Sequence, residues 1–236
     1  MDFAKHELLF SKPRLDKYIK ACNGDTYKGV MLYKYNIQAS QALYPIISVF
    51  EISLRNSIDR ELSKHYKDSD WLMNQRADFS ENPFLVYKDN WGNLQSDLFF
   101  KEKIEKAEKK LNHRKTKINH VKLLAELTFG FWVKFFDPSP IRILKGVPLQ
   151  AFTNKPGISL KKIHSHLNSI VTLRNRISHS EPICFDRTGK LCLDTMRQYQ
   201  FNIEDAIRWL DNDLYKWAEK LNFYKPVVIK ISDLVV

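Results

Sequence analysis

A helical pattern of unusual length occupies the N-terminal part of the chain and constrains the fold more than any other feature. From about residue 26 to residue 65, apolar residues recur at the three- and four-residue spacing of a helix. They include Ile47, Phe50, Leu54, Ile58 and Leu62. Pro45 falls inside this pattern. Because proline lacks an amide hydrogen, we expect it to kink or divide the helix.

The remainder of the chain also favours helices. Only seven of the 236 residues are glycine, which argues against a turn-rich β-sandwich. Further helical patterns occur at about residues 13–22, 97–111, 121–136 and 159–178. No internal repeat or clear linker separates them. We therefore expect one all-α domain over residues 1–236, with a core of about residues 10–220 and a long kinked helix near its N-terminus.

Three segments are less clearly patterned. Residues 66–96 are predicted to form turns around short helices, because they hold prolines, a glycine and two tryptophans. Asn202 is expected to cap a last amphipathic helix that reaches Leu221. The tail, residues 227–236, could be a short strand or an extended arm.

The net charge of +11 favours a polyanionic partner. Nucleic acid is the simplest such partner and an anionic membrane surface is another, although a basic protein can also be merely soluble. No apolar stretch approaches the roughly 18 residues that a membrane helix needs, and the N-terminus has no signal-peptide pattern. Three cysteines without a CxxC pair are typical of reduced thiols. We expect a cytoplasmic protein that acts away from the membrane.

A strongly basic run covers residues 101–117. It could be a solvated helix face or a surface that contacts a nucleic-acid backbone. The aromatic residues that follow, at 129–135, could stack on bases, but packing in the core is the more common use. We take Lys109, Lys110 and Arg114 as candidate RNA contacts, together with Arg55 and Arg176.

The candidate site is Arg174, Asn175 and His179, which lie shortly before Pro182. Arginine supplies a permanent cation for a phosphate, and histidine can move a proton near neutral pH. A loose Arg-to-His spacing also occurs at Arg60–His65 and Arg114–His120, so the spacing alone has little value. Only the third copy has Asn directly after Arg on a helix with a strong apolar stripe.

The spacing has a geometric consequence. On an ideal helix Asn175 and His179 are one turn apart and share a face, whereas Arg174 lies about 140° around the helix from His179. Either the helix loosens at His179, or Arg174 reaches around it, or a second copy of the chain completes the site. Two copies related by a two-fold axis would bring both Arg–His pairs into one basic cleft.

These residue types can cleave RNA without a metal. A neutral imidazole could take the proton of a ribose 2′-hydroxyl, Arg174 could neutralise the phosphate charge, and Asn175 could orient His179 or the substrate. We predict neither a metal site nor a cofactor. His164 and His166 lie on different sides of a helix, which is poor ligand spacing. The alternative is that the cations only stabilise the carbonyl end of a helix.

The segment from Leu173 to Ile183, LRNRISHSEPI, resembles the RNxxxH-x-EPI signature of the Abi-like (abortive infection) proteins, which belong to the HEPN superfamily. Residues 50–56 (FEISLRN) and 126–132 (ELTFGFW) are also similar to the family. The resemblance extends over roughly residues 10–220. One departure is Ser180, where relatives often have a second histidine, so any role for that position is in doubt.

The resemblance implies an all-α fold and a homodimer with a shared active site. It also implies metal-independent cleavage of RNA, with Arg174, Asn175 and His179 in the catalytic positions. The biology it implies is phage defence or toxin–antitoxin action, and some relatives are held in check by a structured small RNA. Two alternatives stay open: a non-catalytic HEPN-like module that binds RNA or a protein, and a helical interaction subunit whose basic surface is incidental.

Overall fold

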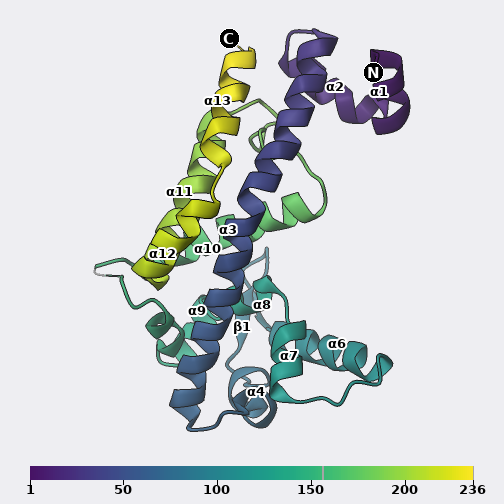
Figure 1. Cartoon of the computed structure of the whole chain (residues 1–236). Coiled ribbons are helices and arrows are strands. Elements are labelled where there is room, and N and C mark those ends of the chain that lie inside the picture. The colour runs from purple at the N-terminus through teal and green to yellow at the C-terminus, as the bar shows by residue number, and fades with distance from the viewer. Residues whose placement is uncertain (156, 236) are drawn as a thin grey trace. The chain divides into compact units, whose positions relative to one another are not determined.

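The computed structural model describes residues 1–155 and 157–235 and is predominantly helical (Figure 1). The described part of the chain forms two compact units. The first comprises Met1–Phe50, Thr172–Arg208 and Asn212–Val236, and the second comprises Glu51–Val171 and Trp209–Asp211. The unit boundaries fall within helices α3 and α10 and at the end of α11, so each unit is built from segments that are distant in sequence. The all-α prediction is confirmed, whereas the expectation of one domain stays a prediction.

The first unit begins with α1 (Phe3–Phe10), α2 (Lys12–Ala21) and the long α3 (Thr26–Tyr66) as far as Phe50. Helix α3 is continuous through Pro45, so the predicted division does not occur. Helices α2 and α3 approach closely at Gly29, where a Cβ atom would lie 2.5 Å from Cγ1 of Ile19. Only glycine fits this contact without a shift of the backbone.

The C-terminal part of the first unit contains the end of α10 (Leu160–Ser178), followed by four further helical elements. These are α11 (Leu193–Leu210), α12 (Asn212–Ala218), the 3₁₀-helix η2 (Glu219–Leu221) and α13 (Tyr224–Val235). Figure 1 shows α11 and α13 side by side, and the Tyr224 hydroxyl of α13 donates to the Met196 carbonyl of α11.

Two sequence predictions for this region are wrong. Asn202 lies inside α11 and caps no helix, because that helix begins at Leu193. The tail is helical rather than a strand or an arm: Tyr224, Val227, Val228 and Ile231 form a buried face at helical spacing. Packing of that face outweighs the β-propensity of its branched residues. Pro226 is tolerated because it falls in the first turn.

The second unit holds the remaining elements. They are α4 (Trp71–Asn74), α5 (Arg76–Phe79), the antiparallel strands β1 (Val86–Lys88) and β2 (Leu94–Ser96), α6 (Phe99–His113), α7 (His120–Glu126), α8 (Phe129–Lys134), α9 (Pro138–Ile143) and the 3₁₀-helix η1 (Val147–Ala151). The hairpin was not foreseen. Gly92 has φ +85° in its turn, a conformation that favours glycine.

An aromatic cluster forms the core of this unit. Its members are Trp71, Phe79, Phe100, Phe131, Trp132 and Phe135, all almost completely buried. The predicted use of the 129–135 aromatics as core is thus confirmed. The single helix predicted over 121–136 is wrong, because Leu127 and Thr128 are extended and separate α7 from α8. Pro138 opens α9.

A half-buried carboxylate of α3 connects this helix to the core. One carboxylate oxygen of Asp59 accepts hydrogen bonds from Trp71 Nε1 and is paired with His120 Nε2, both at 2.8 Å. Because the buried Trp71 and His120 side chains need partners, this shared acceptor helps to fix α4 and α7 on the helix.

Candidate active site

The predicted site residues lie on the last turn of α10. Asn175 and His179 are exposed, and Arg174 is half-buried. The His179 amide donates to the Asn175 carbonyl at 3.0 Å, so the helical turn still closes at His179. The suggestion that the helix loosens there is therefore wrong, and Arg174 and His179 project from different sides of the turn.

A tight reversal follows His179 directly. The Ser180 amide donates to Ile177 O at 3.1 Å, and the Glu181 amide donates to Arg176 O at 2.8 Å. These two bonds form the Schellman motif that commonly ends helices. Ser180 holds the left-handed position of this motif, with φ +55°, where glycine is the usual residue.

We expect Ser180→Gly to stabilise the first unit by about 0.5–1 kcal/mol, because glycine adopts positive φ without a Cβ clash. Urea unfolding of the full chain would measure the change. Ser178→Gly, two residues earlier inside α10, is the matched control and should destabilise by about 0.5 kcal/mol. Destabilisation by Ser180→Gly would contradict this view of the reversal.

Arg176 holds the loop that follows. Its guanidinium donates to the Tyr199 hydroxyl at 3.0 Å, to the Phe185 carbonyl at 3.4 Å and also to the Pro182 carbonyl. Only 19% of the side chain is exposed. The structure thus gives Arg176 structural contacts with the loop and with α11, and its contact with RNA stays a prediction.

Asn36 of α3 holds the same loop from the other side. Its Oδ1 accepts the amides of Ile183 at 2.8 Å and Cys184 at 3.2 Å. Tyr18 of α2 packs edge-on against Phe185. Burial raises the pKa of the Cys184 thiol to about 12, so this cysteine stays protonated near neutral pH and is no nucleophile.

Helix α2 adds two cations that the sequence reasoning missed. Arg14 Nη1 donates to the Ser180 carbonyl at 3.2 Å, and Lys17 Nζ lies 4.5 Å from the centre of the Phe185 ring. Both residues lie about 160 positions before the motif in sequence. Their spacing places both side chains on one face of α2, but it does not indicate that this face meets the end of α10.

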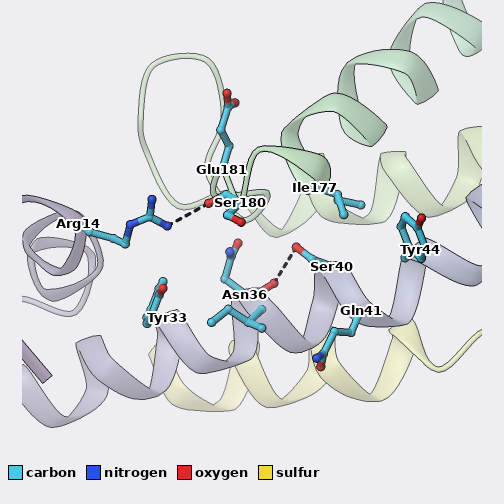
Figure 2. Close-up of a pocket in the computed structure, with 10 residues that line it drawn as sticks. Arg14, Tyr33, Asn36, Ser40, Gln41, Tyr44, Ile177, Ser180 and Glu181 are labelled. Carbon is cyan, nitrogen blue, oxygen red and sulfur yellow. Dashed lines mark hydrogen bonds between the residues drawn. The ribbon is translucent and has the colours of Figure 1, made fainter. Parts of the chain in front are cut away.

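A groove of about 460 Å³ lies beside the reversal. Its lining comes from Arg14 of α2, six residues of α3, Ile177 of α10, and Ser180 and Glu181 just after α10, as Figure 2 shows. Ile177 shares a side of α10 with Arg174, three residues earlier, so the groove adjoins the Arg174 side of the last turn. The site has a candidate acid–base group, nearby cations and an adjoining space for a ligand.

The other candidate RNA contacts belong to the second unit. Lys110 and Arg114 both pair with Glu126, Arg114 at 3.1 Å. The hydrogen bond from Lys110 holds the pKa of Glu126 below its usual value. Lys109 is exposed, and Arg55 Nε donates to Asn56 Oδ1 at 3.1 Å.

Two findings concern the described residues as a whole. Within residues 1–155 and 157–235, no group of three or more His, Cys, Asp or Glu is arranged to hold a metal ion. Over the same ranges, no helix has both the length and the apolar character that crossing a membrane requires.

Comparison with curated proteins and with solved structures gave no match. The family model of the Abi-like proteins matches residues 3–184. The match covers more than three quarters of the chain, including α2, α3 and the whole of the Arg174–His179 turn. The chain therefore belongs to the Abi-like protein family.

Proposed function

We propose that this protein is a metal-independent endoribonuclease of the HEPN type. The observation that carries the proposal is the last turn of α10. It presents His179 and Asn175 to solvent, keeps Arg174 on the same turn, and ends in a loop held by Arg14, Asn36 and Arg176. A rigid support of this kind is what positioned acid–base catalysis requires.

The proposed reaction is an attack of the RNA on itself. The neutral His179 imidazole takes the proton of a ribose 2′-hydroxyl, and the resulting oxygen nucleophile bonds to the adjacent phosphorus. The bond from phosphorus to the 5′-oxygen breaks, and that oxygen takes a proton from a protonated imidazole or from water. The products are a 2′,3′-cyclic phosphate and a 5′-hydroxyl.

Arg174 and Asn175 act on the charge and the orientation. Arg174 neutralises the negative charge that develops on the phosphate oxygens. Asn175 lies one turn before His179 and can donate a hydrogen bond to the substrate or orient the imidazole. Cleavage of labelled RNA in EDTA, comparing the native protein with His179→Ala, tests this assignment.

The site is proposed to be shared between two copies of the chain. The closed helical turn at His179 leaves Arg174 on another side of α10. A two-fold axis near His179 would let one copy supply the histidine and the other the arginine. The protein would then act as a homodimer, with RNA as its substrate.

The exposed lysines of α6 are proposed to attract the RNA backbone. We expect the logarithm of the affinity to fall linearly with the logarithm of the salt concentration, because bound counterions are released. Lys109→Ala should reduce that slope by about 1, measured by fluorescence anisotropy with His179→Ala protein. Lys220→Ala, another exposed lysine, is the control. An affinity that is insensitive to salt would contradict a polyanionic partner.

Membership of the Abi-like family supports a biological role in abortive-infection defence against phage. Within that role the protein would act as a toxin whose cleavage of RNA stops growth of the infected cell. A structured small RNA could serve as its inhibitor. RNA binding without cleavage in the EDTA assay would instead favour a non-catalytic RNA-binding or protein-interaction module.

A further inference from the structure

We infer that the groove between α2, α3 and the end of α10 binds one unpaired, carbonyl-bearing base of single-stranded RNA, next to the phosphate that is cut. The inference rests on the proposed function, whose substrate it specifies. Ile177 and Ser180 line the groove and flank His179 in sequence. Ile177 comes three residues after Arg174 and shares its side of α10, so a nucleotide in the groove would continue toward the cation of the proposed reaction site.

The size of the groove suits such a ligand. Its volume of about 460 Å³ lies within the roughly 300–1,000 Å³ range that small-molecule sites occupy. Proteins recognise single-stranded RNA by stacking its bases on aromatic side chains and by hydrogen bonds to the base edges. The groove offers a group for each of these contacts.

Asn36 supplies a hydrogen-bond donor of fixed orientation. Its side chain is 4% exposed. Both groups that approach its Oδ1, the amides of Ile183 and Cys184, are donors, so the atom between them must be the oxygen. The amide nitrogen is thereby left to the groove, and among the described residues it has no hydrogen-bond acceptor. A donor held in this way matches a base carbonyl oxygen, which uracil has and adenine lacks.

Tyr44 supplies a stacking surface. Its side chain lines the groove and is 55% exposed, and the neighbouring Ile37 is 40% exposed. In the described structure the Tyr44 ring has no aromatic partner, whereas the Tyr33 ring packs against Phe10 and Tyr18. Tyr44 is thus available to stack on a base, while Tyr33 is part of the supporting wall.

The groove has one charged residue that could contact a phosphate of the RNA. Arg14 donates to the Ser180 carbonyl at 3.2 Å and retains further N–H donors for a phosphate. Glu181 also lines the groove, but Figure 2 shows its carboxylate directed away from Asn36 and Ser40. Its nearest cation is Arg176, at 3.9 Å. The positive charge of Arg14 therefore lies at the Ser180 end of the groove, where we expect the phosphate.

The test is binding of short fluorescein-labelled oligouridylate and oligoadenylate to the full-length His179→Ala protein. We expect Tyr44→Ala to weaken oligouridylate binding about five- to 100-fold and Tyr44→Phe to preserve it. Tyr27→Ala is the matched control, since Tyr27 is an exposed tyrosine on the same helix outside the groove. Oligouridylate should bind more tightly than oligoadenylate. Asn36→Asp, which keeps the oxygen acceptor and removes the donor, should abolish that preference.

Several outcomes would overturn the inference. They are equal effects of Tyr44→Ala and Tyr27→Ala, equal binding of the two oligonucleotides, and conversion of a dimer to a monomer by Tyr44→Ala in light scattering. If Asn36→Asp fails to fold, the tyrosine variants and the oligonucleotide comparison still decide. Cleavage is assayed separately on protein that keeps His179. A cleavage rate that is unchanged by Tyr44→Ala would contradict the inference but not the proposed function. Binding that depends on Tyr44, without any cleavage, would contradict the proposed function but not the base-binding groove.

Discussion

Replacing His179 by alanine is expected to lower the rate of RNA cleavage by about 10²–10⁴, the usual contribution of an acid–base group. Arg174→Ala should cause a loss of similar size, because it removes the cation that balances the phosphate charge. The double variant should be little slower than either single variant, since both groups act on one transition state. Single-turnover cleavage of a labelled RNA measures all three rates.

Folding controls decide what a loss of rate means. His179 is exposed at the helix end, so its truncation leaves no cavity and should change the melting temperature little. His113→Ala, at the end of the basic helix α6, is the matched histidine control and should cleave normally. Full activity of His179→Ala, or equal losses in both histidine variants, would contradict the catalytic assignment.

Mixing the two inactive single variants is expected to restore activity. If the arginine and histidine of one site come from different copies, a dimer of Arg174→Ala with His179→Ala contains one intact pair. Co-expression with two affinity tags would isolate that mixed dimer. Unfractionated random mixtures should reach about a quarter of the native rate, because half the dimers are mixed and each has half its pairs intact.

The control for this experiment is each variant co-expressed with a differently tagged copy of itself, which should stay inactive. A purified mixed dimer without activity would show that each protomer acts with its own residues. A monomer in light scattering that retains full activity would exclude the shared site altogether.

Much of the fold follows from local patterns in the sequence. The spacing of Leu54, Ile58 and Leu62 predicts the end of α3, and glycine scarcity with the apolar stripe of α10 predicts a helical chain. The failures have local causes. Two extended residues, Leu127 and Thr128, divide an aromatic segment whose composition is uniform. At the C-terminus, burial of Val227 and Val228 in a helix overrides their strand propensity.

The candidate site likewise has a part that the sequence predicts and a part that it does not. Arg174, Asn175 and His179 are local in sequence, so a motif could identify them. The supports of that motif are not local: Asn36 and Ile183, which share a hydrogen bond, are 147 residues apart. Nothing in the residues around Asn36 predicts that its oxygen holds a loop or that its nitrogen faces a groove. Likewise, the role of Arg176 depends on Tyr199 and on loop carbonyls that only the fold brings to it.

The most direct test of the central claim is the chemistry of the cleavage products, determined by mass spectrometry after incubation of RNA with the protein in EDTA. We expect fragments that end in a 2′,3′-cyclic phosphate and begin with a 5′-hydroxyl, formed by the native protein and absent with His179→Ala. Cleavage that requires added magnesium, or products with a 5′-phosphate and a 3′-hydroxyl, would contradict the proposed attack by the 2′-hydroxyl.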